Sequence, residues 1–164
     1  DAVLKISKKY NLKIIEDCAE AHGVEYKGKK VGSIGDIGAF SFFPNKTITC
    51  GEGGMVVTNS KELAEKARSL KNLSFGEVNK FMHTDIGFNY RMINLSAAVG
   101  CAQMENLNKI IKAKRQNYKK YTKIFKNFDE IKILKEPKNS KSNYWLIIAF
   151  FKSKSLKNKF INIY

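Results

Sequence analysis

The stretch Ser41-Phe-Phe-Pro-Asn-Lys46-Thr-Ile-Thr-Cys-Gly-Glu-Gly-Gly54 sets a single lysine between two apolar segments. A strand is predicted over residues 37–43 before it, and another over 55–58 after the glycine-rich turn. A lysine held between buried strands is poorly solvated, which favours the neutral, nucleophilic amine. In a chain with 30 lysines and arginines, the alternative for Lys46 is a surface lysine in a β-turn.

A carboxylate follows the strand predicted over residues 12–15. Glu16 and Asp17 lie at its carboxyl end, where ligands gather in open α/β sheets. Asp17 is therefore a candidate site residue, and the alternative is a cap on the following turn. Together with Glu20 and His22 these residues suggest a metal cluster, but the HExxH and paired-histidine spacings are absent, so no metal is predicted.

The rest of the chain predicts further elements of an α/β fold. We expect a helix over residues 2–10, a small hairpin over 24–31, a helix that opens at Asn59 or Ser60, a loop over 71–86, a long helix over about 94–126 and a strand over 143–151. Segment 135–142 contains Pro137 and is a predicted linker. It would separate a partial large domain, residues 1–134, from the beginning of a small carboxyl-terminal domain, residues 143–164.

The net charge of +15 raises the question of nucleic-acid binding. Arginine is the residue that most often makes bidentate hydrogen bonds to bases and phosphates. The chain has only three arginines, Arg68, Arg91 and Arg115. The many lysines are spread along helices and tails, which is typical of solvated faces. We therefore expect no nucleic-acid partner, although weak attraction of anionic, nucleotide-linked substrates fits this charge.

The three cysteines, Cys18, Cys50 and Cys101, share no CxxC spacing. They predict reduced thiols in a cytoplasmic protein. The longest apolar run, residues 145–151, is too short to span a bilayer and fits a buried strand, so no membrane association is expected.

Three side chains together match the needs of pyridoxal-phosphate chemistry. Lys46 can form a Schiff base with the cofactor aldehyde and later move a proton. Asp17 can keep the pyridine nitrogen protonated, so that the ring accepts electrons. Ser41, near the end of the strand that precedes Lys46, can contact the phosphate, although an ordinary strand hydroxyl is its alternative role.

Four segments resemble one enzyme family in order and spacing. They are Ile14-Ile-Glu-Asp-Cys-Ala-Glu-Ala-His-Gly23, Gly35-Asp-Ile-Gly-Ala-Phe-Ser-Phe-Phe-Pro-Asn-Lys46, Gly51-Glu-Gly-Gly54 and Gly87-Phe-Asn-Tyr-Arg-Met92. The chain is similar to the DegT/StrS-type sugar aminotransferases, and most to their perosamine-synthase-like branch. The resemblance implies part of the fold-type-I pyridoxal-phosphate large domain: a mixed, mostly parallel sheet flanked by helices, with a long connecting helix.

The resemblance also implies individual roles. Lys46 matches the Schiff-base lysine, and Asp17 matches the partner of the pyridine nitrogen. Glu20 lies where relatives place a residue close to the cofactor ring, and Ser41 matches a phosphate contact. Asn89 matches an asparagine that reaches the cofactor phosphate of the neighbouring subunit, which implies a homodimer with shared active sites.

The implied reaction is transamination of a nucleotide-linked 4-keto-6-deoxy sugar in polysaccharide biosynthesis, with an amino-acid donor such as glutamate. However, no phosphate-gripping loop precedes Asp1, and most of a carboxyl-terminal domain is missing, which predicts a piece of a longer protein. The alternative is a catalytically incompetent remnant that pairs subunits or binds nucleotide sugars. A nucleotide-binding α/β module is less favoured, because Gly32, Gly35 and Gly38 do not form GxGxxG.

Overall fold

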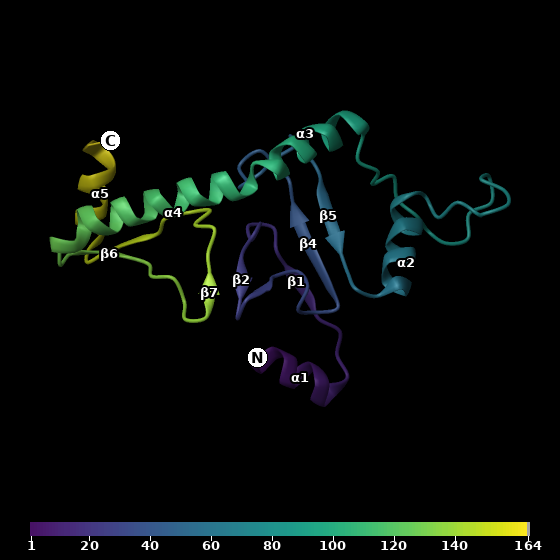
Figure 1. The fold of residues 1–164 in the computed structure, drawn as a ribbon, viewed down its shortest axis with the longest axis horizontal. Coiled ribbons are helices and arrows are strands. Elements are labelled where there is room, and N and C mark those ends of the chain that lie inside the picture. Colours follow the sequence, from purple (N-terminus) through teal and green to yellow (C-terminus); the bar gives the residue numbers. More distant parts are fainter. Residues whose placement is uncertain (164) are drawn as a thin grey trace.

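The central sheet lies next to the Lys46 loop and has three strands. In the computed structural model, which describes residues 1–163, β1 (Ile15–Asp17), β4 (Ile37–Ser41) and β5 (Gly54–Val57) are ordered β1-β4-β5 (Figure 1). β1 runs parallel to β4, whereas β5 is antiparallel to it. The expectation of a mostly parallel sheet is therefore wrong for the described residues, whose sheets are small and mixed. The chain returns from β4 to β5 through loop 42–53 without a crossover helix, and this reverses its direction.

A second sheet joins residues from both halves of the chain. β2 (Glu25–Tyr26) and β3 (Lys29–Lys30) form the expected hairpin, whose central residues Lys27 and Gly28 both have positive φ, as a tight primed turn requires. β7 (Ser140–Lys141) adds to the free edge of β2. The segment expected to be a plain linker thus contains a strand that attaches it to the amino-terminal half.

The third sheet pairs β6 (Ile131–Ile133) with β8 (Ala149–Phe151) in antiparallel register. β6 was not expected from the sequence. Of the strand predicted over residues 143–151, only the last three residues are extended as a strand. Residues 143–148 form irregular backbone instead, and some of them contact the Lys46 loop.

The helices are α1 (Ala2–Tyr10), α2 (Lys61–Lys71), α3 (Asn94–Glu105), α4 (Leu107–Ile124) and α5 (Lys154–Ile163), with a 3-10 turn η1 (Phe125–Asn127) after α4. The predicted cap of α2 is present, because Ser60 Oγ accepts a hydrogen bond from Leu63 N at 3.3 Å. The single helix expected over about 94–126 is interrupted at Asn106. The Asn106 side chain donates to Ala102 O at 2.9 Å and so takes part in local bonding that competes with the regular helix.

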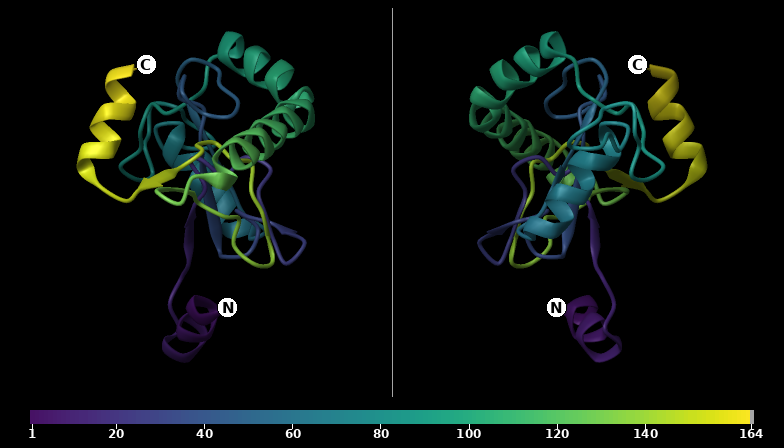
Figure 2. Two further views of the ribbon diagram at one scale, coloured as in Figure 1. Left: turned by 90° about the vertical axis from the view of Figure 1, so that its left-hand side faces the viewer. Right: turned by 90° about the vertical axis from the view of Figure 1, so that its right-hand side faces the viewer.

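The core of the described chain lies between the Lys46 loop and the long helices. Phe42, Ile48 and Cys50 are buried, and they pack against the partly buried side chains of Met92, Leu107 and Ile110. In contrast, α1 stands apart from the other elements in both views of Figure 2 and exposes Val3 and Ile6. Within residues 1–163, no helix combines the length and the apolar character that crossing a membrane requires.

Candidate functional site

The loop that carries Lys46 is fixed at its base and in its core. Phe42 N donates to Gly53 O at 2.8 Å, and Cys50 N donates back to Phe42 O at 3.2 Å. Ile48, only 1% exposed, anchors the loop in the core. These contacts confine loop 42–53, so the position of Lys46 is set by the fold.

The amine of Lys46 lies among three chemically different neighbours. The side chain is 12% exposed, and its Nζ lies 3.2 Å from Glu20 Oε1. The same Nζ lies 4.9 Å from the centre of the Trp145 ring, whose Nε1 donates to Asn45 O at 2.7 Å. Glu20 is half-exposed, so solvent screens the ion pair, and the contact with the aromatic face is worth about 0.5–1 kcal/mol. Lys46 is thus a shielded lysine, not the surface lysine of the alternative interpretation.

Asp17 and Ser41 lie at the same edge of the central sheet as Lys46. Asp17, the last residue of β1, pairs with Ala39 of the parallel strand β4, which continues two residues further to Ser41. Asp17 Oδ1 accepts a hydrogen bond from Ala19 N at 3.0 Å, so this carboxylate does cap the following turn. Its Oδ2 has no hydrogen-bond partner within residues 1–163. Ser41 Oγ accepts from Phe43 N at 3.3 Å, and its hydroxyl proton can still donate to a ligand.

Asn89 lies elsewhere in the chain. It forms an isolated bridge with Asn72 at the end of α2, and its Oδ1 accepts from Arg91 Nε at 3.1 Å. The residue is exposed, and no hydrogen bond or ion pair joins it to Lys46 or Asp17 within residues 1–163. The fold therefore pairs Lys46 with Glu20 and places Asp17 and Ser41 on the two neighbouring parallel strands, whereas the bonds of Asn89 are to Arg91 and Asn72.

Glu16, the neighbour of Asp17, has a structural role. Its carboxylate accepts hydrogen bonds from Gly32 N at 2.9 Å and from Ile34 N and Gly35 N, both at 2.7 Å. The thiol of Cys18 is buried, and this burial, with the charges of Glu16 and Asp17, raises its pKa to about 11. A thiol with such a pKa is protonated and unreactive at neutral pH.

Two polar residues near Lys46 are buried. His22 was weighed from the sequence only as a possible metal ligand, and Asn143 was given no role. His22 is 3% exposed between Phe40 and Phe42, and burial, together with the charge of Lys46, lowers its pKa. Asn143 is also 3% exposed, and its side-chain amide donates to Glu20 O, in the turn after β1, and to Thr47 Oγ1, in loop 42–53. For Asn143 the available signal was a polar residue at the start of a strongly apolar run, which does not identify a partner distant in sequence.

Comparisons with known proteins identify the family of the chain. Residues 1–163 match the DegT/DnrJ/EryC1/StrS aminotransferase family. GDP-perosamine synthase of Escherichia coli O157:H7 is 44% identical over 147 residues, which cover 90% of this chain and 40% of that protein. GDP-perosamine synthase of Vibrio cholerae is 47% identical over 137 residues, or 84% of this chain and 37% of that protein.

A solved structure extends the likeness to the fold. Helicobacter pylori PseC, an aminotransferase involved in the biosynthesis of pseudoaminic acid, matches with a TM-score of 0.89 and 30% identity over 98% of this chain and 44% of that one. The α/β fold of the described residues is therefore that of these aminotransferases. The chain spans about 40% of the length of the curated relatives it matches.

Proposed function

Because this chain belongs to the DegT/DnrJ/EryC1/StrS aminotransferase family, we propose that it supplies the lysine-bearing part of a pyridoxal-phosphate transaminase site. The observation that carries the proposal is the shielded amine of Lys46, held beside the carboxyl ends of β1 and β4. In this proposal Lys46 holds the cofactor covalently and moves protons at the reacting carbon.

The side chains near Lys46 fit this cofactor chemically. Pyridoxal phosphate, when bound, supplies the electron sink for moving an amino group. Asp17 has an unengaged carboxylate oxygen and would hold a proton on the ring nitrogen. Ser41 would donate its hydroxyl proton to the phosphate, and Glu20 would orient the Lys46 amine through the ion pair that it makes in the free chain.

The substrate proposal is a nucleotide-linked 4-keto-6-deoxy sugar, with an amino acid such as glutamate as donor. It is supported by the two relatives named GDP-perosamine synthase, at 44% and 47% identity. The net charge of +15 would raise the local concentration of such an anionic substrate. The whole enzyme would act in polysaccharide biosynthesis.

We also propose that two copies share their sites, with Asn89 directed to the phosphate of the neighbouring subunit. Its exposure, and the lack of a hydrogen bond between it and Lys46 within residues 1–163, are consistent with this role. α3 exposes Leu95 and Val99, at 78% and 51%, which also favours the second candidate function, a subunit-pairing module without catalysis. In either case residues 1–134 would belong to a large domain, 135–142 would link it, and 143–164 would begin a small domain.

Covalent capture of the cofactor tests the proposal. The chain is incubated with limiting pyridoxal phosphate, reduced with borohydride and mapped by peptide mass spectrometry. We expect the pyridoxyl group mainly on Lys46, its loss in Lys46→Ala and no change in the matched control Lys61→Ala, whose lysine lies exposed on α2. Label spread over exposed lysines with no preference for Lys46 would contradict the proposed role. A keto-sugar amination assay with glutamate then separates the enzyme from the pairing module.

A further inference from the structure

We infer that residues 142–145, here called the strap, position the Lys46 amine. The Asn143 amide connects the strap to the turn that contains Glu20 and to the loop that contains Lys46, and the ring of Trp145 lies against the amine. The catalytic meaning of this inference rests on the role proposed for Lys46. The geometry comes from side chains about a hundred residues away along the sequence, since Trp145 Nε1 and Asn45 O are separated by 100 positions.

Asn143 connects two separate parts of the site through one side-chain amide. Its Nδ2 lies 2.8 Å from Glu20 O, 3.2 Å from His22 O and 3.2 Å from Thr47 Oγ1. A primary amide has two hydrogens, so these three acceptors share them. Because the group is buried, no water can replace it without rearrangement. The amide therefore holds the Glu20 turn and the Lys46 loop at a fixed separation.

The other end of the same amide orients Trp145. Asn143 Oδ1 accepts a hydrogen bond from Trp145 N at 3.0 Å, and the indole Nε1 is held by Asn45 O. These two bonds place the ring under Lys46 Nζ, with Glu20 as the second neighbour of the amine. Loss of the Asn143 amide would release the carboxylate neighbour and the aromatic neighbour of Lys46 together.

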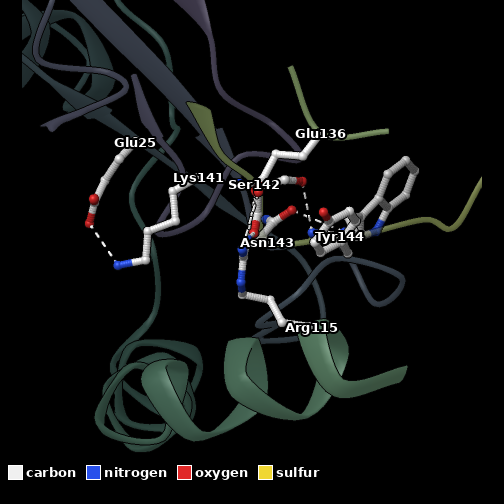
Figure 3. A network of polar contacts seen from close by, with 8 residues as sticks. Glu25, Arg115, Glu136, Lys141, Ser142, Asn143 and Tyr144 are labelled. Carbon is white, nitrogen blue, oxygen red and sulfur yellow. Dashed lines mark hydrogen bonds and ion pairs between the residues drawn. The ribbon is translucent and has the colours of Figure 1, made fainter. Parts of the chain in front are cut away.

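The strap is also anchored to α4. Arg115, on α4, makes a two-pronged ion pair with Glu136 at 2.7 and 3.2 Å and donates to Ser142 O at 2.6 Å (Figure 3). The hydrogen bond from Arg115 holds the pKa of Glu136 below its ordinary value. α4 thus fixes one end of the strap, and the hydrogen bonds of Asn143 connect the strap to the loop that contains Lys46. Asn143 and Trp145 are positioning residues in this scheme.

The experiment uses the fact that Trp145 is the only tryptophan of the chain. Tryptophan emission and its quenching by acrylamide are measured without cofactor on wild type, Asn143→Ala and the control Asn108→Ala, an exposed asparagine on α4. We expect red-shifted emission and stronger quenching in Asn143→Ala alone. Pyridoxal phosphate is then added to the same samples before borohydride reduction. In Asn143→Ala the labelling of Lys46 relative to Lys61 should fall about tenfold, because a displaced amine reacts less often in the productive geometry.

Each outcome decides the inference. Unchanged emission and quenching in Asn143→Ala would overturn it, and so would changed emission with an unchanged Lys46 to Lys61 labelling ratio. If the wild-type chain is labelled no more at Lys46 than at Lys61, the proposed function fails. The fluorescence comparison of wild type with Asn143→Ala still tests whether Asn143 positions Trp145. If Asn143→Ala does not fold, as seen by circular dichroism, Lys46→Met replaces it: its tryptophan emission should differ from that of wild type and of Lys61→Met, and identical emission would overturn the inference.

Discussion

Replacement of Glu16 should loosen the edge of the central sheet that carries Asp17. The carboxylate of Glu16 accepts three backbone hydrogen bonds from the loop that contains Gly32, Ile34 and Gly35. This loop presses against β4, since a Cβ built on Gly38 would lie 2.5 Å from Gly32 Cα. Removing the carboxylate leaves the three amide groups without their partner in a half-buried turn.

The size of the effect follows from the number and type of these bonds. Hydrogen bonds to a charged group contribute about 1.5–3 kcal/mol each, and they are not additive when one side chain makes all three. Partial exposure lets water satisfy some of the amides. We therefore expect Glu16→Ala to lower the free energy of unfolding by about 3–5 kcal/mol, and Glu16→Gln, which keeps one acceptor oxygen, by about 1–3 kcal/mol. A small domain has about 5–15 kcal/mol in total, so the alanine variant should be close to unfolding.

Urea titrations followed by circular dichroism and by Trp145 fluorescence measure both variants. Glu77→Ala is the matched control, because Glu77 is exposed in the loop before α3, and its change should stay within about 0.5 kcal/mol. If Glu16→Ala also stays within about 0.5 kcal/mol of wild type, the reasoning is refuted. The loop would then be held by backbone contacts alone.

Two further perturbations test the surroundings of Lys46. Burial holds the pKa of His22 below its ordinary value of 6.5, so the unfolded chain takes up the proton first and the free energy of unfolding should decrease as the pH falls below 6.5. His22→Phe should flatten this dependence in urea titrations at several pH values while His83→Gln keeps it, and equal slopes in both variants would contradict the assignment. Ile48→Ala should lower the free energy of unfolding by about 2–5 kcal/mol, because the Ile48 side chain anchors loop 42–53 in the core. A loss below about 1 kcal/mol, measured by urea unfolding, would show that the loop is not anchored by this side chain.

The sequence by itself determined the local features of this protein and its family. The Lys27-Gly28 turn, the Ser60 cap and the strands on either side of Lys46 depend on neighbouring residues and so can be read from short segments. The linked motifs around Asp17 and Lys46 indicated the aminotransferase family, which the comparisons confirm. The catalytic roles of Lys46 and Asp17, and the division into domains, stay predictions.

The tertiary structure alone decided which distant groups meet. Asn143 and Trp145 reach Lys46 and its turn across sequence separations of 96 to 123 residues, and an apolar run that predicts a strand carries no sign of such partners. The antiparallel direction of β5 and the pairing of β7 with β2 likewise depend on how the chain returns through space. Hydrogen-bond partners and strand neighbours are properties of the packed chain, because a buried polar group is satisfied by whichever element the fold places beside it.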